Sequence, residues 1–576
     1  MIKCDIVILD SGTISEDLDK YSNNIVGTLS LTCDKSINDN AGHGTAITNQ
    51  IINNAPQSTV FLIKILDSDF ECDAEVLYKA LEYVYNFIDC RIINLSLGVV
   101  NPDNLAPLYN VCRKITQRGT VIFSAYDNNG AISYPAAFDC VYGVDSSIDI
   151  HNKDEFYYIE NSDVNIIAKG LNNRVKWKNG YIFISGTSFS TANISSIVLN
   201  ELIREKNQTV DNIIKRKATK IIQIPTCSPI KRLPEIHKSL VMPYNKEVHS
   251  IVNFHQLFQS KITGFYDVRL SGNVGRRVRS LYDDFETVIQ NYTEINWQSN
   301  DFDSVVLGHT ERLNKLTGFN LYSDVEQKCN LNCKTLISFD RYYSITQNEV
   351  VNRNFDKLNI IPHPVLGVFG TSSRQGKFTL QLLIRKKLQE MGYKVGQLGT
   401  EPSAELFGFD EVYPMGYNGG VHIDGYQAIL YLNQAMNRIS NKNPDIIIVG
   451  SQSGTVSYWF GNLKQFPVKQ IDFLMGTMPD AVLLCVNTFD DINYIRRTIN
   501  MIESLIETKV LALVLSPLAY AKDWHMLMGK LSPCNKQQLN QIKDDFSENL
   551  RLPCFELGNQ EDIDKMILIA LDYFTR

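Results

Sequence analysis

The sequence lacks the features that would place a protein in a membrane or outside the cell. It contains no run of about 18 apolar residues, the length that a membrane-spanning helix needs. The segment Met1–Leu9 carries no long apolar core of the kind found in secretion signals. We therefore expect a cytoplasmic protein with no membrane partner.

Charge of one sign and clustered cysteine are also scarce. The formal net charge is only −7 over 576 residues, and no block of like charge forms a tail for nucleic acid. The 12 cysteines are scattered, which in a chain of this length favours reduced thiols over a disulfide framework. Their spacing does not complete a four-ligand zinc site. We therefore expect no nucleic-acid partner and no certain metal.

Short β-branched runs that alternate with helical patterns make up most of the chain. Such alternation indicates α/β units built on parallel sheets. A chain of this length holds about three domains. Prolines gather between residues 206 and 245, and the pattern breaks again at Pro362 and Pro364. The fold class we predict is α/β, with boundaries near these breaks.

Three motifs in the first third carry chemistry. Asp10 follows an apolar run, His43 lies in Gly-His-Gly-Thr, and Ser188 lies in Gly-Thr-Ser at a probable helix start. A serine hydroxyl becomes a nucleophile only when a base takes its proton, and an acid must orient that base. Each motif alone is a weak signal, but the ordered set predicts a Ser-His-Asp triad.

These motifs, in this order and at these intervals, resemble the three signatures of the subtilase family of serine proteases. The resemblance covers about residues 3–205. It implies a subtilisin-like parallel-sheet domain and peptide-bond hydrolysis that needs no cofactor, with Asp10, His43 and Ser188 as catalytic residues. The alternative is a pseudoprotease that keeps the motifs as a relic of the fold.

Two further segments continue the resemblance. Asn128 falls where the family has the asparagine of the oxyanion hole, a donor that stabilises the tetrahedral intermediate. The family's Ala-Gly before it is Tyr126-Asp127 here, so Asp127 is a rival for the position. The strand that pairs with the substrate backbone corresponds to Ser96, Leu97 and Gly98.

A phosphate-binding loop follows the apolar run Val365–Phe369. Backbone N–H groups of a glycine loop and the following helix N-terminus bind phosphate oxygens, while a lysine reaches the terminal phosphates. The spacing is one residue longer than usual, and Phe378 separates the lysine from the threonine that would meet Mg²⁺. The predicted contacts are Gly370, Thr371, Ser372, Gly376, Lys377 and Thr379.

The longer loop resembles that of a P-loop family that includes D-glutamate N-acetyltransferases. The match extends over about residues 360–530 and includes Asp424, a possible Mg²⁺ contact, and Gln452, a phosphate-site residue. The family's acidic residue at the end of the strand expected at 445–449 is Gly450 here, which weakens the case for catalysis. The ligand that the resemblance implies is ATP or GTP with Mg²⁺, or acetyl-CoA; the alternative is a glycine-rich turn without a ligand.

The expected architecture is therefore a fusion. We predict a subtilisin-like domain over 1–205, a connector over 206–245, a Rossmann-like α/β domain over 246–355 and a P-loop domain over 356–576. The fusion is similar to clostridial peptide-maturation proteins, which implies leader removal from a ribosomally made precursor peptide. The alternative is an acyl- or phosphoryl-transferring enzyme whose protease domain only binds peptide. An oligomer is compatible with the sequence.

Overall fold

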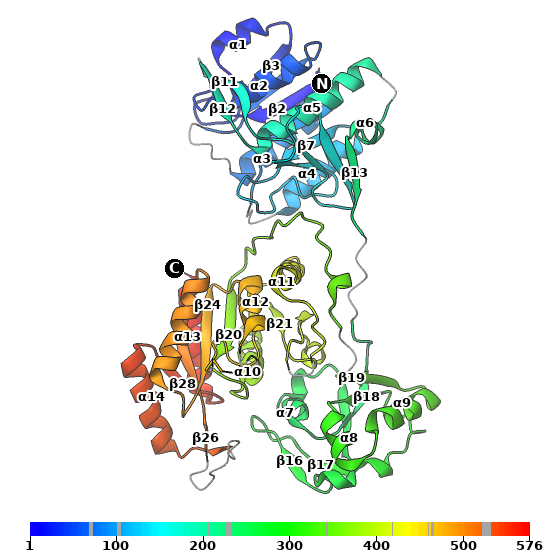
Figure 1. Ribbon diagram of the computed structural model, residues 1–576, viewed down its shortest axis with the longest axis vertical. Helices are drawn as coiled ribbons and strands as arrows, with labels where there is room; N and C mark the ends of the chain where they lie inside the picture. Colours follow the sequence, from blue (N-terminus) through cyan, green and yellow to red (C-terminus); the bar gives the residue numbers. More distant parts are fainter. Residues whose placement is uncertain are drawn as a thin grey trace. The chain divides into compact units, whose positions relative to one another are not determined.

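The computed structural model describes residues 1–67, 73–100, 105–178, 180–205, 208–225, 232–339, 344–416, 419–458, 460–461, 463, 466–520 and 531–575. The chain divides into two compact units (Figure 1). Unit 1 comprises Met1–Cys227 and Val351–Pro362, and unit 2 comprises Ser228–Val350 and His363–Arg576. The fold class predicted from the sequence, α/β with mainly parallel sheets, is confirmed.

Unit 1 is built on a large sheet in the strand order β13-β9-β10-β8-β7-β6-β2-β4-β3. Its strands pair in parallel except β9 with β10. The strands are β2 (Ile6–Asp10), β3 (Ile25–Ser30), β4 (Val60–Lys64), β6 (Ile92–Leu95), β7 (Val121–Ala125), β8 (Tyr142–Ser147), β9 (Phe156–Glu160), β10 (Ile166–Lys169) and β13 (Lys220–Gln223). Two short pairs add β1 (Ile2–Lys3) with β5 (Ile88–Asp89), and β11 (Asn173–Trp177) with β12 (Gly180–Ile184).

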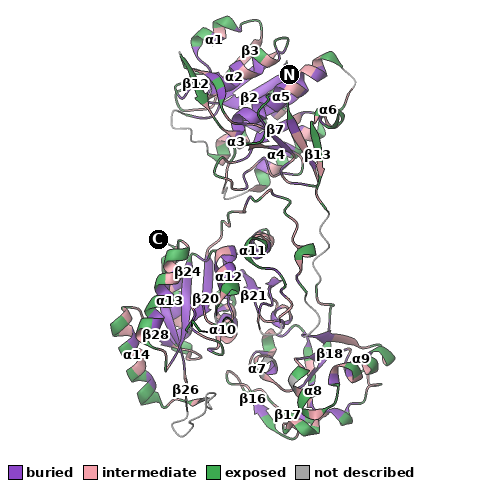
Figure 2. Cartoon of the chain, in the orientation of Figure 1, coloured by how far each residue is buried: buried purple, intermediate pink, exposed green. Residues whose placement is uncertain are grey.

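Helices cover both faces of this sheet, because its strands are apolar on both sides. Ile6 and Ile8 join the core under one helix layer, whereas Val7 and Leu9 join the core under the other. The first layer contains α2 (His43–Asn54), α5 (Thr187–Arg204) and α6 (Val210–Lys217), and the second contains α3 (Ala74–Phe87) and α4 (Leu105–Gln117). Helix α1 (Ser15–Lys20) follows β2. Figure 2 shows β2 buried along its length.

The first sheet of unit 2 has the strand order of a Rossmann-like domain. Its parallel strands run β17-β15-β14-β18-β19, which is 3-2-1-4-5 in chain order, and β16 pairs antiparallel at the edge. The elements are β14 (Lys238–Met242), α7 (Lys246–Asn253), β15 (Lys261–Asp267), β16 (Arg277–Arg279), β17 (Glu286–Asn291), β18 (Ser304–Leu307), α8 (Glu311–Thr317), α9 (Leu321–Leu331) and β19 (Thr335–Ser338).

The second sheet of unit 2 is wholly parallel, in the order β22-β21-β23-β20-β24-β25-β28. Strands β20 and β24 lie at its centre and are fully buried (Figure 2). The strands are β20 (Val365–Gly370), β21 (Val395–Gly399), β22 (Glu411–Val412), β23 (Ile446–Gly450), β24 (Ala481–Asn487), β25 (Lys509–Ser516) and β28 (Cys554–Glu556), with a hairpin of β26 (Leu518–Tyr520) and β27 (Leu531–Pro533). The helices are α10 (Lys377–Glu390), α11 (Gly425–Ser440), α12 (Val468–Thr477), α13 (Ile492–Leu505), α14 (Lys536–Leu550) and α15 (Gln560–Phe574).

The two sheets of unit 2 share a hydrophobic core. The rings of Phe258 and Phe407 pack at 5.5 Å between centroids, and the Gln259 N–H donates to the Leu406 carbonyl. The residues are apolar and buried on both sides of this contact, so neither sheet forms a separate body.

The structural boundaries differ from the expected ones. The segment predicted as a connector, 206–245, contains α6 and β13 of unit 1 and β14, the central strand of the next sheet. Both strands are short, and β13 is mostly exposed, so neither gives a strong hydrophobic pattern. Residues 206–207 and 226–231 of that segment lie outside the described residues. The second difference is that 351–362, divided in the prediction between two later domains, belongs to unit 1.

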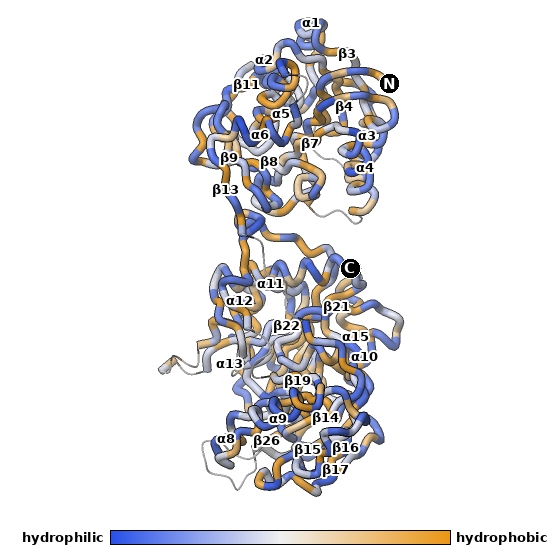
Figure 3. Tube along the Cα trace, turned by 90° about the vertical axis from the view of Figure 1, so that its right-hand side faces the viewer, coloured by the Kyte–Doolittle hydropathy of each residue, from blue (hydrophilic) through white to orange (hydrophobic). Residues whose placement is uncertain are grey.

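Within the described ranges, no helix is long and apolar enough to cross a membrane. Figure 3 shows apolar and polar stretches alternating along the tube.

A buried carboxylate connects the beginning of unit 2 to the edge of its second sheet. Glu411 on β22 is 3% exposed; Arg438 contacts it through two bonds at 3.1 and 3.0 Å, and Arg232 donates to it at 2.5 Å. Both guanidinium groups keep partial solvent contact.

We predict that Glu411→Ala destabilises unit 2 by on the order of 2 kcal/mol, below the about 3–5 kcal/mol of fully buried pairs. Calorimetric unfolding should show a lower transition temperature, and the exposed Glu548→Ala should leave it unchanged; equal transitions would contradict the prediction.

Candidate active site and phosphate loop

Strand β2 and helix α2 bring an acid and a base together. Asp10 ends β2 and is buried, and His43 is the first residue of α2. The Nδ1 atom of His43 lies 2.7 Å from Oδ1 of Asp10. A Cβ atom at Gly44 would lie 2.3 Å from the Gly12 carbonyl oxygen. The glycine after the histidine therefore allows the α2 backbone to approach the loop that follows Asp10.

The carboxylate of Asp39 organises the start of α2. One oxygen accepts bonds from the Ser11 hydroxyl and from the N–H groups of Ala41 and Gly42. The other accepts from the N–H and the hydroxyl of Thr45. Asp39 is 3% exposed, so these bonds are shielded from water. The predicted site residues do not include Asp39, although an acidic residue just before a helix start is a known capping signal.

The electrostatic environment favours a charged imidazole at His43. Burial lowers its pKa, but the charge and hydrogen bond of Asp10, together with the charge of Asp39, raise the pKa above its ordinary value. The rings of Trp177 and Phe189 lie 6.3 and 5.9 Å from the imidazole centroid. A histidine in this setting is held in one orientation and readily accepts a proton.

Ser188 lies at the start of α5, on the sheet face that α2 also covers. Its hydroxyl donates to the Ser96 carbonyl at 2.9 Å, and the Ser96 hydroxyl donates to the Ser188 carbonyl at 3.1 Å. The next residue, Phe189, contacts the imidazole of His43. The structure thus brings all three residues of the predicted triad into one neighbourhood.

Asn128, and not its rival Asp127, contacts the serine helix. The Asn128 Oδ1 atom accepts bonds from the Thr187 N–H at 2.9 Å and the Thr187 hydroxyl at 3.1 Å. This fixes the amide so that its Nδ2 group is the end left to donate. The Asp127 carboxylate accepts the N–H of Asn129 in the turn.

The strand segment proposed to bind substrate lies next to Ser188 through its first residue. Ser96 is buried against the serine, as described above, and the Leu97 carbonyl accepts a bond from the Ser124 hydroxyl at 3.3 Å. Gly98 is exposed, and a Cβ atom there would lie 2.9 Å from the Ser133 hydroxyl. Substrate pairing along this segment stays a prediction.

The predicted phosphate loop connects β20 to α10. Gly370 ends the strand, and Gly376 caps the helix with φ of 80°, a conformation that favours glycine. Lys377 is the first helical residue, and its Nζ atom donates to the Ser372 carbonyl at 2.6 Å. Burial lowers the pKa of Lys377 to about 8. The lysine is therefore buried beside the loop that would receive an anion.

Side chains from inside and outside the loop hold it in shape. Asp490, which follows β24, accepts a bond from the Thr371 hydroxyl at 2.5 Å, and Gln375 donates to the same hydroxyl. Asn487 donates to the Ser372 hydroxyl at 2.8 Å. Burial raises the pKa of Asp490, against the lowering effect of these donors. No local pattern in the sequence points to Asp490, because it lies more than 100 residues from the loop.

The remaining predicted phosphate or metal contacts lie around the same sheet. Thr379 lies in the first turn of α10, and Gln452 donates to the Thr400 carbonyl at 3.1 Å. Asp424 precedes α11, is exposed, and adds to the effect of burial in raising the pKa of Asp472. In the part of the chain that the structure describes, no three or more His, Cys, Asp or Glu side chains group in a way that could hold a metal. Magnesium binding by Thr379 and Asp424 stays a prediction.

Gly450 ends β23 where the resembling family has an acid. A Cβ atom there would lie 1.9 Å from the amide carbon of Gln381, a buried residue of α10. Among the residues that the structure describes, the Gln381 Oε1 atom has no hydrogen-bond partner. The space for a carboxylate is therefore filled by a neutral amide.

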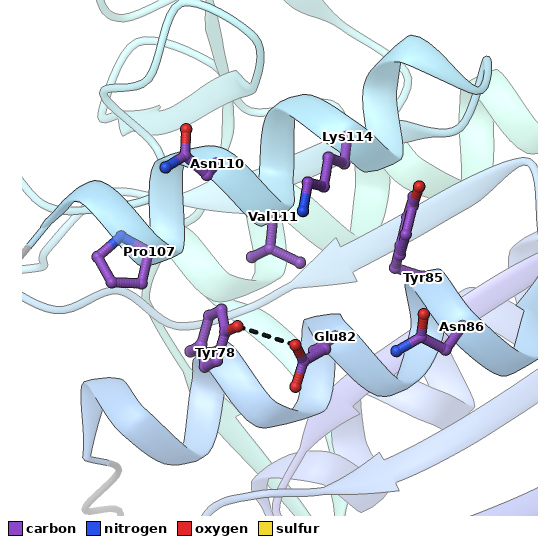
Figure 4. A pocket seen from close by; sticks show the side chains of 8 residues that line it. All are labelled: Tyr78, Glu82, Tyr85, Asn86, Pro107, Asn110, Val111 and Lys114. Carbon is purple, nitrogen blue, oxygen red and sulfur yellow. Dashed lines mark hydrogen bonds between the residues drawn. The ribbon is translucent and has the colours of Figure 1, made fainter.

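A groove between α3 and α4 lies on the sheet face opposite α2 and α5 (Figure 4). Its walls are polar and aromatic, and the Tyr78 hydroxyl donates to Glu82 at 2.9 Å. The residues that line it are Tyr78, Glu82, Tyr85, Asn86, Pro107, Asn110, Val111 and Lys114. None of the triad residues contributes to it.

Comparison with known proteins gives two family matches, one in each half of the chain. The model of the subtilase family matches residues 6–225, and that of a P-loop domain of unknown function, DUF1611_C, matches residues 358–556. The crystal structure of a cold adapted subtilisin-like serine proteinase is similar at 16% identity and a TM-score of 0.30, covering 36% of this chain and 79% of that one. No curated protein matches. The chain thus carries a subtilase-family domain and a P-loop domain of unknown function.

Proposed function

We propose that unit 1 is a serine endopeptidase that uses Asp10, His43 and Ser188. The observation that carries the proposal is the 2.7 Å contact of His43 with Asp10, next to the helix that carries Ser188 in its first turn. Within the subtilase match, this arrangement supplies a nucleophile, a base and an acid that orients the base.

In this mechanism the Ser188 hydroxyl leaves the Ser96 carbonyl and donates to Nε2 of His43. The imidazole takes the proton as Oγ attacks the peptide carbonyl, and returns it to the leaving amine. The Ser188 N–H and the Asn128 amide donate to the oxyanion. Water then attacks the acyl-enzyme with the same histidine as base, which releases the acid product and restores Ser188.

The substrate we propose is a ribosomally made precursor peptide that loses its leader in the cytoplasm. An extended peptide would pair with Ser96, Leu97 and Gly98. The ten cysteines among the described residues are free thiols, which supports a reducing compartment.

For the P-loop domain we propose a phosphate site for ATP or GTP with Mg²⁺, or for acyl-CoA, or a dock for the precursor. The buried Lys377 and the glycine-capped start of α10 support an anion site. The alternative, a transferase in which the protease domain only binds peptide, has less support, because Gln381 fills the space beside Gly450.

The proposed oxyanion donor gives a first test. Asn128→Ala should lower kcat by about 10²–10³ with a smaller effect on KM, because the amide acts on charge that develops in the transition state. The neighbouring Asn129→Ala is the matched control and should keep full activity. The activity of both variants is measured by cleavage of a tagged precursor and by labelling with a fluorophosphonate. Undiminished cleavage by Ser188→Ala would overturn the proposed function.

The acid limb of the pH profile gives a second test. Because the pKa of His43 is raised above its ordinary value, kcat/KM should rise with pH through a limb that lies above about 6.5. Asp39→Asn removes one of the charges that favour the imidazolium, so the limb should move to lower pH. An unmoved limb in Asp39→Asn would contradict this assignment.

Phosphate binding gives a third test. At pH 8 about half of Lys377 is neutral, since its pKa is lowered to about 8. A bound phosphate favours the charged form, so binding should take up protons at pH 8 and almost none at pH 6. Calorimetric titration with ATP, GTP and acetyl-CoA in buffers of different ionisation enthalpy measures this uptake. Lys377→Ala should abolish binding, and Lys386→Ala, on the same helix, should not. Binding that both variants retain would show that Lys377 is not part of the phosphate site.

A further inference from the structure

A distant segment completes the protease unit. Residues 351–362, which we name the strap, pack on unit 1 although they follow the Rossmann-like sheet in the chain. The subtilase match ends at residue 225, so the strap lies outside the part that the family model describes. It contacts the loop of residues 126–135 that contains Asn128, which we name the oxyanion loop.

The strap holds the start of the oxyanion loop through Lys357. This lysine is 5% exposed, its Nζ atom lies 2.8 Å from Asp145, and it lies 5.4 Å from the ring centroid of Tyr126. The Tyr126 carbonyl accepts the Thr187 hydroxyl at 2.6 Å. Thr187 is also the residue that fixes the Asn128 amide. One chain of contacts therefore runs from Lys357 to the residue before Ser188.

The strap also holds the later part of the oxyanion loop. The Ile132 N–H donates to the Leu358 carbonyl at 3.1 Å. Phe355 packs against the cluster that contains Ile132 and Tyr126. The Arg353 carbonyl accepts the Ser162 hydroxyl and, at 3.2 Å, an N–H from the neighbouring loop.

Between these two anchors the oxyanion loop forms a turn, in which the Gly130 N–H donates to the Asp127 carbonyl at 3.2 Å and the Asn129 N–H donates to the Asp127 carboxylate at 2.8 Å. Gly130 adopts φ of 95°, and the Asp127 N–H donates to the Ser133 hydroxyl at 3.0 Å. Asn128 itself is exposed. The position of its amide therefore depends on its two bonds with Thr187 and on what holds the loop at each end, and catalysis by such a donor is sensitive to small displacements.

We propose that the strap positions the oxyanion loop for catalysis, with Lys357 as the positioning residue. A buried ammonium group paired with a carboxylate has a defined geometry, and its removal leaves Asp145 without that partner. The proposal rests on the proposed protease function. If it is right, activity of the protease unit depends on residues that follow the Rossmann-like sheet in the chain.

Substitutions in the full chain test the proposal. Lys357→Met should lower kcat roughly tenfold, a part of what an oxyanion donor supplies, with KM nearly unchanged. Lys357→Arg, which keeps the charge, should restore most of the loss. Lys3→Met, the same change at an exposed position of unit 1, is the matched control. Circular dichroism is used to choose an assay temperature at which all variants are folded. If Lys357→Met is unfolded at every assay temperature, Asp145→Asn replaces it in the test.

The decisive measurement is a double-mutant cycle with Asn128→Ala. If Lys357 acts through the oxyanion loop alone, Asn128→Ala should cost about 10–10² in the Lys357→Met background, roughly tenfold less than the about 10²–10³ in the parent chain. Losses that multiply, or a Lys357→Met variant with parental kcat, would overturn the positioning role and leave the protease assignment intact. A parent chain that neither cleaves peptide nor reacts with a fluorophosphonate would instead overturn the protease function and this inference with it.

Discussion

The candidate active site depends on a carboxylate outside the triad. Asp39 accepts five hydrogen bonds, one from the segment after Asp10 and four from the residues around the start of α2. These bonds fix the position of His43 at the start of the helix. The Ser11 hydroxyl that donates to Asp39 also accepts the Gly44 N–H, so the segment after Asp10 and the segment around His43 form one bonded unit. The short Asp10–His43 contact follows from this arrangement, because both side chains extend from backbones that Asp39 already holds together.

The phosphate loop uses the same principle with different groups. Asp490 holds Thr371 and Gln375 from a neighbouring strand end, and the loop keeps its shape while Lys377 donates to a carbonyl within it. At both sites an acid accepts several donors and holds the loop that precedes a helix. Because this backbone is preorganised, little free energy is needed to rearrange it when a charged group binds.

The sequence was sufficient for local features. Asp10, His43 and Ser188 each lie within a short motif at a strand end or helix start, and the parallel sheets follow from β-branched runs of ordinary length. It was insufficient where the information is spread along the chain. Lys357 and Tyr126 are separated by more than 200 positions, and β13 is a short exposed strand with no clear apolar pattern.

The strap also has a consequence for how the protein is made. Chains are synthesised from the N-terminus, and domains generally fold as units as they emerge. The residues that pack against the oxyanion loop lie at 351–362, so the protease unit stays incomplete until the Rossmann-like sheet that precedes them has been translated. A nascent chain would then carry its nucleophile long before its catalytic environment was assembled.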